Sequence, residues 1–139
     1  MIEIAELVLL AEAMGVHVEW GRDLPVPAEY DHARRVIRMA DGRGDCVTRC
    51  SLAHELGHAA LHHEADGDYI AQERSANMYA AKLLISEDAY RRAERIVGHD
   101  PRALAKELDV TLVMVVAWRM CHKACLLYTS DAADDMQCV

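Results

Sequence analysis

The pattern of apolar and polar positions is helical at the start of the chain and then alternates. Residues 2–14 form a helix-like apolar stripe, which Gly15 can close as a C-cap. Residues 16–20 alternate with a period of two, which predicts a short strand that ends at Gly21. The two prolines that follow predict a loop.

A hairpin and a sharp turn are expected next. Residues 29–33 and 36–39 flank two arginines and have the pattern of two short strands joined by a turn. The run Asp41-Gly42-Arg43-Gly44 carries strong turn signals. Together with the strand at 16–20, these segments predict a small antiparallel sheet.

The rest of the chain has helical periodicity. Asp45 is the expected N-cap of a helix that continues to about His63, where Asp66-Gly67-Asp68 interrupts the pattern. Start signals and apolar spacing predict four more helices: residues 69–85, residues 86–97, one opened by Asp100-Pro101, and residues 111–123. We therefore expect a mainly helical α+β fold with one domain in residues 1–124.

Composition and charge agree with one folded domain and exclude some classes of function. The 139 residues are 53% hydrophobic and 27% charged, which is ordinary for a globular protein. The formal net charge of -8 gives no positive field for nucleic acid. The apolar N-terminus has no basic residue and is too short to cross a bilayer. We expect a cytoplasmic protein that binds neither DNA nor a membrane directly.

The five cysteines are odd in number and lack the spacing of a disulfide framework. This is the usage expected of free thiols in a reducing compartment. Cys46 and Cys50 can share a helical face, so a metal-binding pair is an alternative to two half-buried thiols.

The stretch from Cys125 to Asp134 is similar, over ten consecutive residues, to the translation of a transposase adaptor used in DNA library preparation. We therefore expect residues 125–139 to be a non-native tail and set them apart from fold and function. The alternative is a natural polar C-terminus with an exposed Leu-Leu-Tyr. On the first interpretation, the acidity of the tail carries no functional message.

The run His54-Glu55-Leu56-Gly57-His58 carries the chemistry. Two histidines four residues apart lie on one face of a helix, so both imidazoles can reach the same metal ion. In this motif the intervening Glu55 is the general base for a metal-activated water and is not a ligand. Gly57 is a poor helix former, which indicates close packing of another backbone or access to the metal. The alternative is a chance arrangement of two surface or core histidines.

A catalytic zinc usually takes three protein ligands and keeps one position for water, so a third ligand is expected. Glu73 and Asn77 fall on one face of the predicted helix 69–85. Glu73 can complete a His2Glu site for Zn2+, and Asn77 can hydrogen-bond a ligand imidazole. The alternatives are a solvated carboxylate near the start of the helix and an ordinary polar asparagine.

Other residues compete with Glu73. His63 gives a spacing found in other zincins, whereas Glu64 stands where a metzincin has its last histidine and Leu61 replaces the glycine of that motif. His62 continues the face of the first two histidines, but three successive turns of one straight helix rarely converge on one ion. We expect His62 and His63 to lie at the rim of the site.

The ImmA/IrrE family of metallo-endopeptidases is similar to this chain in two segments, Ser51-Leu-Ala-His-Glu-Leu-Gly-His-Ala-Ala-Leu-His and Glu73-Arg-Ser-Ala-Asn-Met-Tyr-Ala-Ala-Lys-Leu-Leu. The resemblance covers about residues 1–124, and its firmest parts are HELGH and ExxAN. It implies a mainly helical zincin-like domain, zinc bound by His54, His58 and Glu73, and Glu55 as the base.

The resemblance also implies a function. Members of the family are cytoplasmic zinc endopeptidases of bacteria, phages or integrative elements, and they cleave helix-turn-helix repressors to relieve repression. We therefore expect such a repressor as substrate or partner. The alternative is a non-proteolytic zincin-like regulator that binds a repressor in a toxin–antitoxin or phage-immunity pair. Residues 104–111 resemble half of a helix-turn-helix that packs on the protease core, and Tyr79 and Tyr90 are candidate oxyanion stabilisers that packing also explains.

Overall fold

The computed structural model describes residues 1–64 and 66–132, with side chains through His122. Helices predominate over a small sheet within these ranges, so the mainly helical α+β class is confirmed. The elements are α1 (Ile4–Ala13), β1 (His17–Gly21), β2 (Ala28–Asp31), β3 (Val36–Ala40), α2 (Asp45–Ala60), α3 (Tyr69–Leu84), α4 (Glu87–Val97), α5 (Pro101–Leu108) and α6 (Leu112–Ala132).

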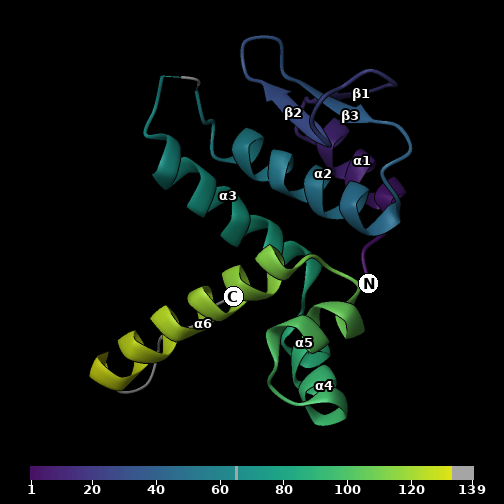
Figure 1. The fold of residues 1–139 in the computed structure, drawn as a ribbon. Coiled ribbons are helices and arrows are strands. Elements are labelled where there is room, and N and C mark those ends of the chain that lie inside the picture. Colours follow the sequence, from purple (N-terminus) through teal and green to yellow (C-terminus); the bar gives the residue numbers. More distant parts are fainter. Residues whose placement is uncertain (65, 133–139) are drawn as a thin grey trace.

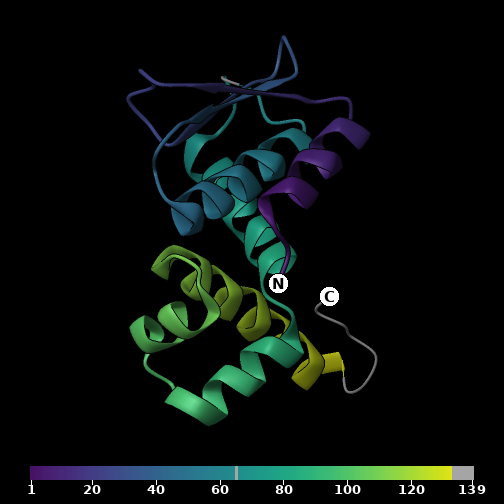
Figure 2. The ribbon, with the colours of Figure 1, turned by 90° about the vertical axis from the view of Figure 1, so that its right-hand side faces the viewer.

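The sheet lies at one end of the molecule with α1 and α2 beneath it, and α4, α5 and α6 lie at the other end (Figures 1 and 2). Helix α3 contacts both α2 and α6 and so connects the two ends. Helix α2 contacts strands β2 and β3 as well as α3. Residues projecting from α2 toward α3 are therefore held between the sheet and the second half of the chain.

The sheet is mixed, with strand order β1-β3-β2. The β2–β3 hairpin is antiparallel as predicted, with Ala28 opposite Met39, but β1 pairs parallel to β3, with His17 opposite Val36. The expectation of a wholly antiparallel sheet is therefore wrong for β1. Period-two alternation identifies strands without fixing their neighbours, and the loop after β1 carries the chain across β3 to the far side. Strand β2 consequently lies at an edge of the described sheet.

The core between the sheet and the helices fixes the orientation of α2. Ile37 and Met39 of β3 are fully buried, as are Leu52, Leu56 and Ala59 of α2. The spacing of these α2 residues confirms that they form its core face. His54 and His58 lie off this core face and point toward α3.

Both ends of α2 differ from the prediction. Its N-cap is Gly44, with φ +82°, while Asp45 is the first helical residue, where its carboxylate favours the positive end of the helix dipole. The helix ends at Ala60, and His62 has φ +54°, a left-handed conformation that stops helical propagation. His62 therefore does not continue the face of the two upstream histidines.

Arg35 fixes the β2–β3 hairpin to the ends of two helices. Its Nη1 donates to the Ala59 carbonyl at 3.2 Å, and its Nη2 donates to the Met14 carbonyl at 3.0 Å. The same Nη1 lies 2.7 Å from the Tyr30 hydroxyl on β2. The edge strand is thereby held in a fixed position over the C-terminal part of α2.

The helices after α2 begin where the sequence indicated. Helices α3, α4 and α5 are each capped by a side chain that accepts from the backbone N–H three residues on, with the caps at Asp68, Ser86 and Asp100. Helix α6 extends to Ala132, past the predicted end at Lys123. Of the tail predicted to be non-native, residues 133–139 lie outside the described residues, and its origin stays a prediction. No helix in the described part of the chain is both long and apolar enough to cross a membrane.

Candidate metal centre

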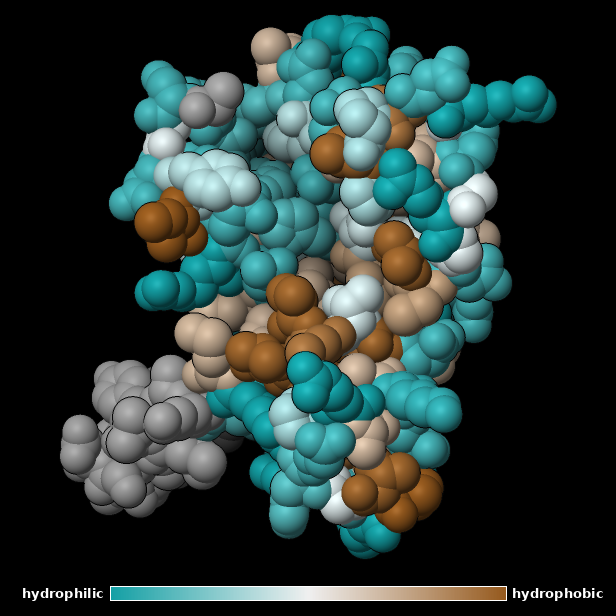
Figure 3. Space-filling model, in the orientation of Figure 1, coloured by the Kyte–Doolittle hydropathy of each residue, from teal (hydrophilic) through white to brown (hydrophobic). Residues whose placement is uncertain are grey.

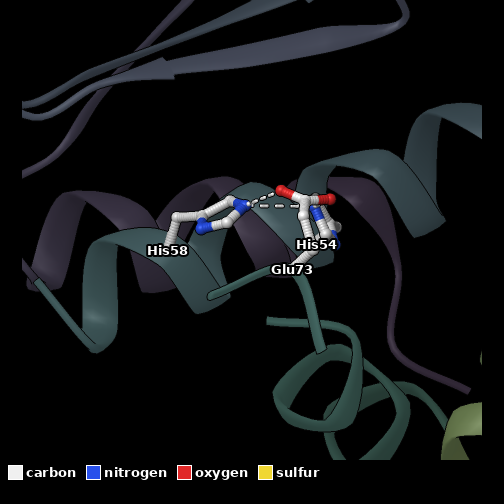
Figure 4. A group of neighbouring side chains, drawn as sticks. All are labelled: His54, His58 and Glu73. Carbon is white, nitrogen blue, oxygen red and sulfur yellow. Dashed lines mark hydrogen bonds and ion pairs between the residues drawn. The ribbon is translucent and has the colours of Figure 1, made fainter. Parts of the chain in front are cut away.

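The three residues predicted to bind a metal meet between α2 and α3. His54 and His58 lie one turn apart on α2, and Glu73 reaches them from α3 (Figure 4). His54 Nε2 lies 3.1 Å from Glu73 Oε2 and 3.1 Å from His58 Nε2. His58 Nε2 lies 2.8 Å from Glu73 Oε1. The fold thus brings together three donors that are separated in sequence.

These donors fit a zinc ion. Ligand atoms at about 2.0–2.1 Å from a tetrahedral zinc lie roughly 3.3 Å from one another, and the observed separations are 2.8–3.1 Å. Burial and the neighbouring His54 ring lower the pKa of His58, which favours the neutral imidazole that metal binding requires. Two imidazoles and one carboxylate are also a common donor set for catalytic zinc.

Gly57 allows the two helices to approach closely enough for this cluster to form. A Cβ atom at position 57 would lie 2.8 Å from the Ala76 carbonyl oxygen and 2.9 Å from the Ala76 Cα. Ala76 is one turn beyond Glu73 on α3, and Gly57 precedes His58 on α2. The glycine thus marks close packing of another backbone, one of the two alternatives that its sequence position suggested.

Glu55 is the buried carboxylate of the site, with 9% of its surface exposed. Burial, together with the nearby Glu73 and Glu29 carboxylates, raises the pKa of Glu55 to about 8. A cation held by the adjacent donors would favour its ionised form. Glu55 is not one of the three clustered donors, in agreement with its expected role beside the metal and not on it.

His63 contacts a predicted ligand from the side away from Glu73. Its Nδ1 lies 2.9 Å from the Nδ1 of His58, whose Nε2 faces the cluster. The backbone explains why His63 lies beside His58. His63 N donates to His58 O at 2.9 Å, and His62 N donates to Ala59 O at 3.2 Å. These two bonds form a Schellman motif, with His62 at the left-handed position. His63 is therefore placed to orient the His58 ring.

A large cleft with a volume of about 1040 Å3 opens onto the site along β2 and the start of α3. Glu55, His58 and Glu73 lie on its wall, and the remaining lining includes the acidic residues Glu29, Asp31, Glu64 and Asp66. A second, small pocket of about 350 Å3 continues from the same place toward α6. Ala28, Glu55 and Glu73 line both, so the metal centre lies where the large cleft and the small pocket meet.

Tyr30 and His32 are residues of the large cleft that the sequence did not single out. The Tyr30 hydroxyl lies 2.9 Å from His32 Nδ1, and the His32 ring packs edge-on against His62. Period-two register along the strand expected at residues 29–33 was the available signal, since it places both residues on the same side, although β2 ends at Asp31 and His32 lies in the turn that follows. Tyr30 and His32 lie near the site because β2 is an edge strand of the sheet. The alternation of residues along a strand does not reveal the place of that strand in the sheet.

Within the described part of the chain, the other polar residues considered from the sequence make no hydrogen bond to the clustered donors. Tyr90 is buried, stacks on Trp118 and accepts a hydrogen bond from Arg119 Nε at 2.7 Å, so it cannot serve the site. Tyr79 is half-buried, and burial raises the pKa of its phenol. Asn77 lines the small pocket, and among the described residues it makes no hydrogen bond to either imidazole.

Cys46 and Cys50 belong to no group of three metal-binding side chains among the described residues. Burial, together with Cys50 and Asp109, raises the pKa of the Cys46 thiol to about 11, which disfavours the thiolate that a metal requires. Within the described part of the chain, the one cluster of three metal-binding side chains is that of His54, His58 and Glu73. Cys46 and Cys50 form no disulfide.

Two histidines one turn apart, a glutamate from the next helix and a buried glutamate beside them are arranged as in the HExxH metallopeptidases. The chain belongs to the M78 peptidase family, since the family model described as the IrrE N-terminal-like domain matches residues 5–117. The resemblance to the ImmA/IrrE family is thereby confirmed.

A solved structure titled Mycobacterium tuberculosis transcriptional regulator has a similar fold. The TM-score is 0.57 at 19% sequence identity, and the alignment covers 86% of this chain and 40% of that chain. This chain therefore spans less than half the length of the structure it matches. A comparison with curated protein sequences gives no match.

Proposed function

We propose that this chain is a zinc-dependent endopeptidase that cleaves a helix-turn-helix transcriptional repressor and so relieves repression. The observation that carries the proposal is the meeting of His54, His58 and Glu73 where the large cleft and the small pocket join, beside a buried glutamate that is not a donor. Membership in a peptidase family supports peptide hydrolysis as the reaction.

The roles of the residues follow from this geometry. His54, His58 and Glu73 would hold zinc, which when bound lowers the pKa of a water molecule and polarises a carbonyl group. Glu55, on the wall shared by the large cleft and the small pocket, accepts a proton from the attacking water. It then returns the proton to the amide nitrogen that leaves. His63 holds the His58 ring in place through the Nδ1 contact.

The edge strand supports a polypeptide as the substrate. Strand β2 is bonded to β3 on one side and lines the large cleft, so its other side can pair with an extended segment. Backbone hydrogen bonds to such an edge hold a peptide irrespective of its sequence, and side-chain pockets then supply specificity. A flexible linker in a repressor meets this requirement better than a folded surface does.

The test is cleavage of helix-turn-helix repressors, chosen first from the products of the genes that flank the gene of this protein, by the purified, zinc-loaded chain. Glu55→Gln should retain zinc and lose cleavage by about 10²–10⁴-fold, the usual contribution of general acid–base catalysis. Glu87→Gln is the control, because Glu87 lines neither the large cleft nor the small pocket and its side chain is 60% exposed. It should cleave as the wild type does.

Undiminished cleavage by the zinc-loaded Glu55→Gln variant would overturn the proposal. A repressor that copurifies with the zinc-loaded wild-type protein and stays intact would instead favour a non-proteolytic regulator. Mass spectrometry of the repressor after incubation separates these two outcomes.

A further inference from the structure

His32 lies on the wall of the large cleft, in the turn that follows β2. The same cleft is lined by Glu55, His58 and Glu73 of the metal centre. Figure 3 shows mainly hydrophilic surface in the hollow between α3 and the sheet. A peptide in the cleft therefore meets polar side chains, and His32 is one of those that belong neither to the metal donors nor to the base.

Neighbouring side chains fix the orientation of the His32 ring. The Tyr30 hydroxyl lies 2.9 Å from its Nδ1, and the His62 ring packs edge-on against it with 5.8 Å between the ring centroids. His32 Nε2 lies 4.0 Å from Glu64 Oε1, which is too long for a hydrogen bond. Because Glu64 also lines the large cleft, Nε2 is the nitrogen that faces it. Among the described residues, this nitrogen has no hydrogen-bond partner.

The hydrogen bonds behind the ring determine which nitrogen of His32 carries the hydrogen. Arg35 Nη1 lies 2.7 Å from the Tyr30 hydroxyl, and a guanidinium can only donate. The Tyr30 oxygen therefore accepts from Arg35, and its own hydrogen is left to donate to His32 Nδ1. An uncharged imidazole that accepts at Nδ1 carries its hydrogen on Nε2. Arg35 is itself fixed, because it donates to the carbonyl oxygens of Ala59 and Met14.

The charges around His32 limit what its Nε2–H can bind. Asp31 and Glu64 line the same cleft, and their carboxylates repel an anionic acceptor. Arg38 also lines the cleft, but its guanidinium is paired with Glu29 at 3.2 Å. The acceptor that suits this donor is therefore uncharged. The backbone of a peptide offers one such acceptor, a carbonyl oxygen, at every residue.

We infer that His32 binds the substrate, with its Nε2–H donating a hydrogen bond to a backbone carbonyl oxygen of the peptide in the large cleft. This inference rests on the proposed function, because it assumes that a peptide lies in that cleft. Tyr30 and Arg35 are positioning residues, since they act through His32 and hold its hydrogen on the nitrogen that faces the cleft.

The first measurement is the tautomer of His32 in the full chain, by long-range proton–nitrogen NMR at an alkaline pH at which imidazoles are uncharged. This readout needs neither zinc nor activity, and the signals missing from His32→Gln identify the ring. The wild type should carry the hydrogen on Nε2. Tyr30→Phe removes the donor to Nδ1 and should show a mixture of the two tautomers. A wild-type hydrogen on Nδ1 would overturn the inference.

The second measurement is binding to the zinc-loaded full chain by calorimetry. The probes are acetohydroxamate, which binds at the metal alone, and two alanine peptides that carry a hydroxamate at the N-terminal or the C-terminal end. In the wild type, the peptide that extends to His32 should bind more tightly than acetohydroxamate. His32→Leu should reduce that gain by about 3–10-fold, the contribution of one uncharged hydrogen bond.

Two variants separate binding from a structural role. His32→Gln should keep most of the gain, because its amide can donate from the position of Nε2. Both His32→Gln and His32→Leu lose the acceptor of the Tyr30 hydroxyl, so a purely structural role predicts equal losses, and equal losses would refute the inference. His17→Leu is the matched control, since His17 is exposed on β1 and lines neither the large cleft nor the small pocket. It should bind all three probes as the wild type does.

Failure of this inference can be told apart from failure of the proposed function. Equal binding of all three probes by the wild type would contradict the role of His32 and leave the metal site in place. Absence of acetohydroxamate binding to the wild type would overturn the metal site and the inference together. The Glu55→Gln cleavage assay tests the proposed reaction separately, because the hydroxamates measure binding without cleavage.

Discussion

Replacing Gly57 with alanine should damage the metal centre more than it damages the fold. The added Cβ would lie 2.8 Å and 2.9 Å from the carbonyl oxygen and Cα of Ala76. Both are backbone atoms, so no side-chain rotation relieves the clash. To restore ordinary contacts of about 3.5–4.0 Å, α2 and α3 must separate locally by roughly 0.5–1 Å.

The consequences for stability and for metal binding differ in size. Overpacking of this kind costs about 1–3 kcal/mol, and removing a helical glycine returns up to about 1 kcal/mol. The fold should therefore survive. Metal–ligand distances tolerate only about ±0.2 Å, and Glu73 lies on the helix that moves. We expect the affinity for zinc to fall by about 10–100-fold, as when the groups that orient a ligand are removed.

The assay is competition for zinc against a fluorescent chelator, with thermal unfolding of the metal-free protein measured in parallel. Gly21→Ala is the control, because a Cβ at position 21 meets nothing within 4 Å, and its zinc affinity should be unchanged. Adding Ala76→Gly to Gly57→Ala should restore little, since the Ala76 backbone remains in place. Zinc affinity of Gly57→Ala within about twofold of the wild type would refute the idea that helix spacing sets the site.

Further substitutions test the contact on the His58 ring and the buried contact between Arg49 and Asp109. His63→Phe removes the partner of His58 Nδ1 and should weaken zinc binding about 10–100-fold in the same competition assay. His62→Gly, which suits the left-handed cap, should leave zinc binding unchanged, and a similar loss in both variants would argue against an orienting role. Arg49 is 3% exposed and binds the carboxylate and carbonyl oxygens of Asp109. Arg49→Met should destabilise the protein by about 1–3 kcal/mol in urea unfolding, and an unchanged midpoint would contradict this.

Sequence patterns predicted what depends on local chemistry. The capping residues Ser86 and Asp100 start helices because each side chain accepts from a nearby backbone N–H. The spacing of His54 and His58 follows from the helical repeat alone. Glu73 was also predicted, because its helix is strongly periodic and the family resemblance points to the same position.

Features that depend on long-range packing were not predictable in this way. The parallel pairing of β1 with β3 follows from how the chain crosses the sheet, and no residue in β1 encodes its neighbour. For the same reason Tyr30 and His32 were missed, since only the edge position of β2 brings them to the cleft. The approach of Gly57 to Ala76 likewise joins two helices whose relative position the sequence does not state.

His63 shows how a local backbone detail can change the chemistry assigned to a residue. A helix continued to His63 would carry that ring about 1.4 turns along the axis from His58, out of reach of its Nδ1. The left-handed conformation at His62 instead closes a Schellman motif, whose geometry brings the residue after it back over the turn that carries His58. An apolar contact commonly occupies this position, and here an imidazole does. The end of α2 is therefore part of the metal centre, because the bond that terminates the helix also sets the orientation of a ligand ring.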